Sequence, residues 1–133
     1  MPIDPLHPSI ELPGLSVTLD NLVHRYEPQQ APADRPHLFI YFLTIHNHSD
    51  RRVTLLARKW VVQRPDGETE VIEGDRIVGQ TPSLAPGETF SYNSFHLTGT
   101  DAAVRGAFFG LDEQGHRIHV RIPALDLRVP TME

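Results

Sequence analysis

Alternating hydrophobic and polar positions recur along most of this chain, and they predict strands. A period of two residues is the spacing of side chains that share one face of a strand, whereas no segment shows the 3.6-residue period of a helix. Alternating or continuously apolar runs cover residues 15–26, 38–47, 53–63, 69–72, 88–97, 104–111 and 116–122. We therefore predict about seven strands, with residues 38–47 the strongest of them.

Turn-forming residues separate these runs. Asp66-Gly67 lies between two β-rich segments, which is typical of a hairpin. Pro86-Gly87 suits positions i+1 and i+2 of a type II turn, because proline presets φ and glycine tolerates a positive φ. Residues 27–36 contain three prolines and little apolar bulk, so we expect a mobile surface loop there. Pro123 is expected to end or bulge the last strand.

This order of strands and turns favours an all-β fold. We predict an antiparallel β-sandwich of immunoglobulin or fibronectin type III character, with a barrel as the second choice. The chain has 133 residues and no cysteine, so one core without disulfides is expected, centred on Trp60. We assign residues 1–13 to a flexible N-terminal arm, 14–128 to a single domain and 129–133 to a C-terminal tail.

Charge and composition limit the partners. With 12 basic and 17 acidic residues the net charge is −5, which opposes non-specific attraction to nucleic acid or to a membrane surface. The absence of cysteine fits a reducing compartment. The first residues contain several prolines and no apolar run, so we expect neither a signal peptide nor a spanning helix. These features favour a cytoplasmic protein.

One apolar row is the leading candidate for function. In residues 38–47 the side chains of 39, 41, 43 and 45 form the core row, so Ile40 and Phe42 are expected to point outwards. Single exposed apolar residues are normal on protein surfaces. If Phe95 or Phe109 lies beside this row, the patch becomes a face for a protein partner or a homodimer. Its candidate rim charges are Arg51, Arg52 and Arg58.

A glycine-spaced loop offers a second candidate. Gly74 and Gly79 flank Arg76, and we expect mainly a structural loop whose glycines adopt positive φ. A dinucleotide fingerprint would need a helix after the loop, and Pro82 with a turn follows instead. The alternative is a site for a small anion such as pyrophosphate, formed by loop amides, Arg76 and Arg58.

Histidines and hydroxyls give weaker signals. His46 and His48 share one strand face and are the first candidates for a divalent metal, but zinc sites normally need three or four protein ligands, so solvated histidines are favoured. Ser94 and His96 lie about 7 Å apart on one strand face, too far for a direct hydrogen bond between nucleophile and base. We expect no catalysis and no required cofactor.

The chain resembles the ApaG domain family. The similar residues, in order, are Phe39-x-Tyr41-x-Leu43-Thr44-Ile45-x-Asn47, Leu55-Leu56-Ala57-Arg58-x-Trp60, Gly74-x-x-x-x-Gly79, Pro82-x-Leu84-x-Pro86-Gly87-Glu88-x-Phe90-x-Tyr92-x-Ser94, Gly106 and Ile122-Pro123-Ala124. The resemblance implies a fibronectin-III-like sandwich without established catalysis, used as a protein-interaction module. Small bacterial members are associated by name with divalent-cation resistance and efflux. Two positions depart from the family: Arg76 replaces a loop glycine, and Ser94-Phe95 replaces Ser-Gly.

Overall fold

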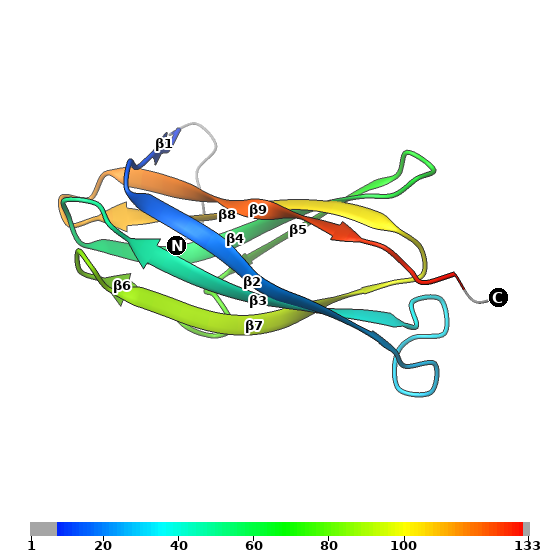
Figure 1. Cartoon of the computed structure of the whole chain (residues 1–133). Coiled ribbons are helices and arrows are strands. Elements are labelled where there is room, and N and C mark those ends of the chain that lie inside the picture. Colours follow the sequence, from blue (N-terminus) through cyan, green and yellow to red (C-terminus); the bar gives the residue numbers. More distant parts are fainter. Residues whose placement is uncertain (1–7, 132–133) are drawn as a thin grey trace.

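The computed structural model describes residues 8–131, whose strands form two sheets packed face to face (Figure 1). The strands are β1 Ile10–Glu11, β2 Leu15–Tyr26, β3 His37–Asn47, β4 Val53–Gln63, β5 Thr69–Asp75, β6 Ser83–Leu84, β7 Thr89–Thr98, β8 Ala102–Asp112 and β9 Arg117–Leu127. Two of them contain only two residues each, so the seven longer strands agree with the predicted number. No helix occurs among the described residues.

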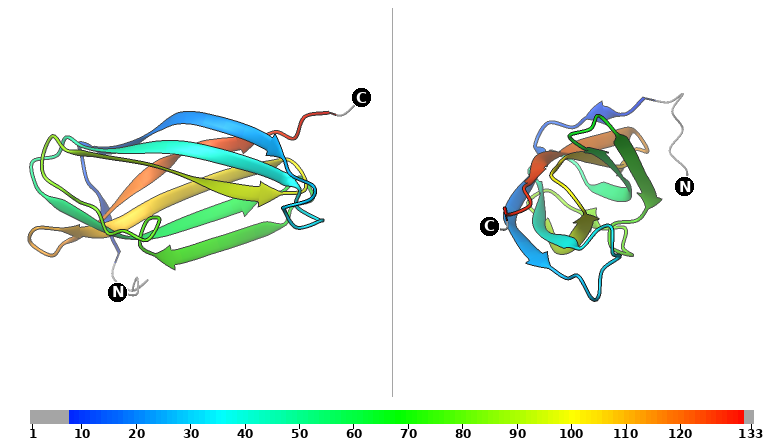
Figure 2. Two further views of the ribbon diagram at one scale, coloured as in Figure 1. Left: turned by 90° about the horizontal axis from the view of Figure 1, so that it is seen from below. Right: turned by 90° about the vertical axis from the view of Figure 1, so that its right-hand side faces the viewer.

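The larger sheet has the strand order β1-β9-β8-β4-β5, with β6 paired to the other end of β4, and the smaller sheet has the order β2-β3-β7. Neighbouring strands are antiparallel except β1 and β9, which are parallel. Figure 2 shows the two layers from below and from one end. The predicted antiparallel β-sandwich is therefore confirmed, and the barrel is not formed.

Strand ends follow the sequence pattern to within two residues except at β5 and β9. β5 continues past its predicted end at Ile72 to Asp75, so Gly74 lies in the strand and lacks the positive φ expected of a loop glycine. β2 and β4 have the predicted bounds, whereas β9 continues beyond its predicted end at Ile122 as far as Leu127. The register of β8 and β9 shifts between Val104 and Gly106, and this bulge takes up Pro123 and Ala124 opposite Arg105. Proline has no N–H to donate, and the residues of a bulge need not donate to the neighbouring strand. Pro123 is therefore accommodated in the bulge, and β9 continues beyond it.

Both predicted tight turns are present. Gly67 and Gly87 have φ angles of 90° and 91°, the left-handed region that glycine adopts without a steric penalty. The Glu88 amide donates to the carbonyl of Ala85 over 3.0 Å, which closes the turn around Pro86-Gly87. These turns set the register of the strands on either side, and so they determine which face of each strand is buried.

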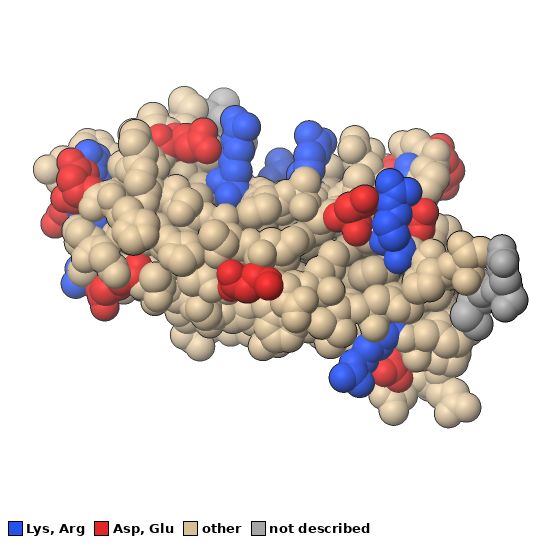
Figure 3. All heavy atoms as spheres, in the orientation of Figure 1, with Lys and Arg blue, Asp and Glu red and all other residues tan. Residues whose placement is uncertain are grey.

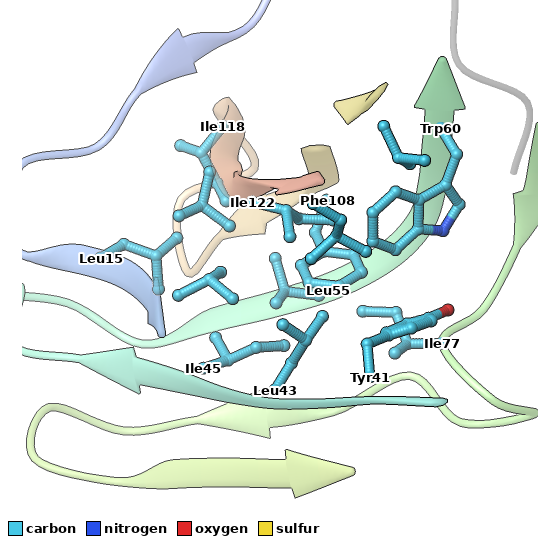
Figure 4. Close-up of a cluster of buried hydrophobic side chains, with 14 of the residues drawn as sticks. Leu15, Tyr41, Leu43, Ile45, Leu55, Trp60, Ile77, Phe108, Ile118 and Ile122 are labelled. Carbon is cyan, nitrogen blue, oxygen red and sulfur yellow. The ribbon is translucent and has the colours of Figure 1, made fainter. Parts of the chain in front are cut away.

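The core lies between the sheets, with Trp60 near one end of it (Figure 4). Trp60 is 2% exposed, and its ring meets Tyr41 of the opposite sheet edge-on at 5.1 Å between centroids. A Cβ atom on Gly106 would lie 2.6 Å from the Trp60 ring, so this glycine makes room for the indole. Trp60 is thus buried in the core, as predicted, but it lies towards one end of the core and not at its centre.

The segments outside the main strands are only partly described. Residues 1–7 of the predicted arm and 132–133 of the predicted tail lie outside the described residues. Ile10–Glu11 pairs with β9, and Leu12 is 3% exposed within the core. In the loop at 27–36, the Glu27 amide donates to the Pro36 carbonyl at 2.8 Å, which closes the loop at its base.

Candidate functional site

The outer face of the smaller sheet carries a patch of apolar side chains. Ile40 and Phe42 alternate with the buried row of β3 and are half-buried on the side away from the core, as predicted. Cross-strand neighbours extend this row on both sides: Ile40 lies between Val23 of β2 and Phe95 of β7. We define the apolar patch as Val23, Leu38, Ile40, Phe42, Phe95 and Leu97. Phe95 is its most open member, with 54% of its surface exposed.

The strands that carry the apolar patch have almost no charge of their own, although Arg35, Arg64 and Glu70 line the pocket beside Phe95 and Leu97. Among the residues of β2, β3 and β7, only Asp20 and Arg25 carry a formal charge, and both lie on β2. Asp20 is held by hydrogen bonds from Thr44 and Thr18, which lower the pKa of its carboxyl group. Figure 3 shows few charged side chains over the middle of these strands and more of them towards both ends and over β8 and β9.

The proposed rim charges lie elsewhere. Arg51 and Arg52 follow the end of β3, about 23 Å along the strand from Ile40 at a rise of about 3.3 Å per residue. Arg51 contacts Asp50 and the buried Asp112, with a distance of 3.2 Å from Nη1 to Asp112 Oδ2. The Asp112 carboxylate also accepts hydrogen bonds from His116 and from the Gln114 amide.

These contacts fix the charge of Asp112. Burial opposes ionisation, but hydrogen bonds from His116, Gln114 and Arg51 outweigh it and hold the pKa of Asp112 at about 2. The carboxylate is thus ionised at neutral pH and ties the turn after β3 to the turn after β8. Arg51 serves this end of the sandwich, and it does not border the apolar patch.

Phe109, the other aromatic considered for the patch, lies on the larger sheet. It belongs to β8, and its ring lies 6.0 Å from that of His119 on β9. The two phenylalanines therefore mark the outer surfaces of different sheets. Of these two phenylalanines, Phe95 lies beside Ile40 and extends the apolar patch, and Phe109 does not.

A second candidate site lies where β5 runs into the glycine-spaced loop. A pocket of about 240 Å³ brings together Arg58, Arg76 and Gly79 with Tyr41, Tyr92 and Ser94. Arg58 Nη1 donates to the carbonyl oxygens of Asp75 and Arg76 at 2.7 and 2.8 Å, so this side chain supports the loop. A Cβ on Gly74 would lie 2.7 Å from the Arg58 guanidinium, which explains why a glycine suits position 74.

The same loop has unusual backbone geometry. Arg76 and Val78 have φ angles of 68° and 49°, although neither is glycine, and Gly79 has a φ of 76°. The loop is pinned by Ile77, which is fully buried and exchanges two backbone hydrogen bonds with Gln80. Left-handed backbone at a non-glycine residue costs roughly 1–2 kcal/mol, and such strain concentrates at ligand sites.

The histidines do not converge on one point. The rings of His46 and His48 stack at 5.9 Å with an interplanar angle of 16°, and His46 Nε2 is hydrogen-bonded to Thr18 at 3.0 Å. His96 lies on the opposite, core-facing side of the smaller sheet, so it cannot join His46 and His48 around a metal. No group of three or more histidine, aspartate or glutamate side chains suited to a metal occurs within residues 8–131.

His96 has an environment that the sequence did not reveal. Its ring stacks on Tyr41 at 5.1 Å and meets Trp60 edge-on at 4.9 Å. Burial lowers the pKa of His96 to about 4, and its Nε2 is buried without a hydrogen-bond partner among the described residues. No hydrogen bond joins Ser94 to His96 in this part of the chain, as the strand spacing predicted.

A groove on the larger sheet was also missed. It measures about 540 Å³ and is lined by Lys59, Arg105 and Arg121 around Ala107. Lys59 and Arg121 are both cross-strand neighbours of Ala107, one on each side. Among the basic residues of β9, Arg121 lines this groove, and the pairing of β9 with β8 and of β8 with β4 brings Arg105 and Lys59 beside it.

Two sheets, antiparallel pairing of the long strands and an aromatic core without disulfides define the chain as a β-sandwich domain. The ApaG domain family model matches residues 27–110. Protein ApaG of Vibrio cholerae is 32% identical over 123 residues, covering 91% of this chain and 95% of that protein. Protein ApaG of Shewanella frigidimarina is 35% identical over 105 residues, covering 78% and 83%. The chain belongs to the ApaG domain family.

Solved structures agree with this assignment. A crystal structure of an ApaA protein from Bordetella pertussis is 28% identical, with a TM-score of 0.73, and the match covers 92% of this chain and 99% of that one. Within residues 8–131 there is no helix of the length and apolarity that a membrane crossing requires.

Proposed function

We propose that this chain is a non-catalytic protein-interaction module of the cytoplasm, and that the apolar patch on the smaller sheet is its docking surface. The observation that carries the proposal is the pairing of the exposed Phe95 with Ile40, in a sheet face where only β2 carries charge. Interface centres are depleted of charge and enriched in aromatic residues. No metal or cofactor is required for this role.

Burial of the apolar patch against a partner protein is more favourable than its exposure to water. Burying apolar area contributes roughly 25 cal/mol per Å², and a phenylalanine that is half exposed offers a large unburied area. The same face has neutral hydroxyl and amide side chains at Thr44, Ser91 and Asn93, which can supply hydrogen bonds at the margin. A charged partner surface would gain little there.

The test compares the two sheets in one chain. Phe42→Asp places a charge in the apolar patch, whereas Val61→Asp places the same charge on the outer face of β4 in the larger sheet. Each variant, once shown to fold by circular dichroism, is used with the wild type to capture proteins from a lysate, and each retained protein is then purified and titrated. We expect a direct binder that loses at least tenfold in affinity for Phe42→Asp and keeps its affinity for Val61→Asp.

Binding that ignores Phe42→Asp and Ile40→Asp in folded protein would contradict the proposal. Light scattering over a concentration series identifies the homodimer, which would show a doubled mass that Phe42→Asp abolishes. In that case the docking surface stands and the partner is a second copy.

A second candidate function is binding of a small anion such as pyrophosphate in the pocket beside the glycine-spaced loop. Two non-glycine residues with left-handed backbone line this pocket together with Arg58, and this strain favours the candidate. Titration calorimetry with pyrophosphate should give saturable heat that Arg76→Ala removes. Absence of heat with the wild type would exclude the site.

A further inference from the structure

β7 forms an open edge of the smaller sheet. Among the described strands it pairs only with β3, in an antiparallel ladder without a register shift from His37–Thr98 to His46–Thr89. The amide of Asn47 donates to the carbonyl of Glu88, and antiparallel ladders alternate residue by residue. The even-numbered residues of β7 therefore bond to β3.

The odd-numbered residues consequently turn their backbone groups away from β3. Ser91, Asn93 and Phe95 direct N–H and C=O groups to the open side, and none of them takes part in a backbone hydrogen bond outside the β3 ladder within residues 8–131. These free N–H and C=O groups occur at every second residue, which is the spacing at which a further strand could form hydrogen bonds with β7.

This edge lacks the features that usually prevent edge pairing. Natural sheets protect their edges with charges, proline, bulges or very short strands. The opposite edge, β2, has Asp20 and a register shift between Leu19 and Asn21. In the larger sheet β5 has three acidic residues and β1 only two residues in all. β7 has ten residues and contains neither a charged residue nor a proline.

The space beside β7 indicates what kind of strand would fit. Two hollows lie along the opening between β7 and β5. One is the pocket lined by Arg58, Arg76 and Asp75, and the other is a pocket of about 160 Å³ at Phe95 and His96, where Arg64 pairs with Glu70 and Arg35 adds a further cation. Arg76 is exposed and forms no ion pair with another described residue. An inward side chain of an added strand would enter these hollows, and a carboxylate would meet the Arg76 guanidinium.

We propose that β7 accepts an extended segment of a partner protein as a fourth strand of the smaller sheet, with an acidic side chain of that segment directed at Arg76 and Arg58. This inference rests on the proposed function, because it specifies how the partner sits at the same sheet. A second copy fits less well: β7 has no acidic residue, so pairing of two β7 strands would bring no carboxylate to the pocket of Arg58 and Arg76.

A displayed library of random peptides, selected on the whole chain, tests the proposal. We expect enriched peptides to be extended, with alternating polar and apolar residues and one aspartate or glutamate in the middle. Hydrogen exchange of the Ser91, Asn93 and Phe95 amides should slow at least tenfold when such a peptide binds, because an added strand protects those groups.

Three variants complete the test. Asn93→Pro removes an outward N–H without touching the β3 ladder and should weaken peptide binding at least tenfold, whereas Asn93→Ala, its matched control, should not. Arg76→Glu should remove the preference for acidic peptides.

The inference would be overturned if enriched peptides bind Asn93→Pro normally or leave the amides of Ser91, Asn93 and Phe95 unprotected. It would also be overturned if no peptides are enriched, or if the chain binds only to a second copy of itself. If such peptides are lost only with Phe42→Asp, the edge inference fails while the apolar patch remains the docking surface. If binding is insensitive to Phe42→Asp as well, both fail.

Discussion

The two sheets enclose one core, yet their outer surfaces differ. The strands of the larger sheet contain the charged residues Glu11, Arg58, Lys59, Glu70, Glu73, Asp75, Arg105, Asp112, Arg117, Arg121 and Asp126, of which Asp112 alone is buried, whereas the strands of the smaller sheet contain only Asp20 and Arg25. Core packing cannot account for this difference, because both sheets bury the same kind of side chain inside. The outer surface of a sheet is freer to vary than its inner one, so the difference indicates a separate role for the smaller sheet.

The largest expected change in unfolding free energy comes from replacing a buried phenylalanine of β8, compared with its outward-facing neighbour on the same strand. Phe108 is fully buried, and its neighbour Phe109 points to the outer surface of β8. Phe108→Ala should lower the free energy of unfolding by about 3–5 kcal/mol, because it leaves a cavity between the sheets. Phe109→Ala, the matched control, should lower it by about 1 kcal/mol or less. Urea denaturation of both variants measures the difference, and equal losses would mean that β8 is not oriented as described.

A smaller effect follows from His96, which joins the smaller sheet to Trp60 of the larger one. The ordinary histidine pKa is 6.5, and burial lowers that of His96 to about 4 in the fold. The unfolded chain therefore takes up the proton first as the pH falls. This imidazole should destabilise the fold by on the order of 3 kcal/mol between pH 6.5 and pH 4, with no effect above that window.

Replacing the imidazole tests this origin. His96→Phe should flatten the dependence of unfolding free energy on pH in that window. Asp112→Asn should leave most of the slope there unchanged, because the carboxyl group contributes between its ordinary pKa of 3.8 and its folded pKa of about 2, below the acid end of the window. A wild-type stability that does not vary between pH 6.5 and pH 4 would show that His96 is not buried in the neutral form.

The loop after β5 tests how the edge of the larger sheet is held. Arg76 has a φ of 68°, so Arg76→Gly should relieve backbone strain and raise the free energy of unfolding by about 1 kcal/mol. Gly79→Ala, at a φ of 76°, should lower it by a similar amount. In thermal unfolding we expect the Tm to rise for Arg76→Gly and to fall for Gly79→Ala. A Tm that shifts in the same direction for both variants would contradict the loop conformation.

The smallest effect is expected from a charge pair on the larger sheet. Lys59 Nζ lies 3.6 Å from Glu73 Oε1, with 43% of the Lys59 side chain and 62% of the Glu73 side chain exposed. A double-mutant cycle with Lys59→Ala and Glu73→Ala should give a coupling of about 0.5 kcal/mol or less, since water and salt screen such pairs. A coupling well above 1 kcal/mol would mean that the charges of this sheet stabilise the fold itself.

Much of the fold could be predicted from the sequence. The bounds of β2 and β4, the turns at Gly67 and Gly87 and the outward direction of Ile40 and Phe42 all follow from local rules of alternation and backbone geometry. The short strands β1 and β6 escaped notice because two residues contain no period, and their pairing partners lie far away in the sequence.

The site was harder to predict because it depends on which strands become neighbours. Ile40 and Phe95 are 55 positions apart in the sequence, and only the β3–β7 register places them side by side. The prediction that Arg51 borders the apolar patch is wrong for the same reason. Arg51 lies close to Ile40 and Phe42 in the sequence, but it contacts Asp112 at the end of the sandwich. The anion-site hypothesis combines Arg76 of the loop with Arg58 of β4, and the structure places both around one pocket.

The most direct measurement of the docking surface uses a photo-reactive phenylalanine analogue, placed either at Phe95 or at Phe109 and activated in living cells. The two positions carry the same natural side chain on the outer surfaces of opposite sheets, so one serves as the control for the other. We predict covalent adducts with a distinct protein from position 95 and none above background from position 109. Adducts from position 109 alone, or equally from both positions, would contradict the assignment of the smaller sheet as the docking surface.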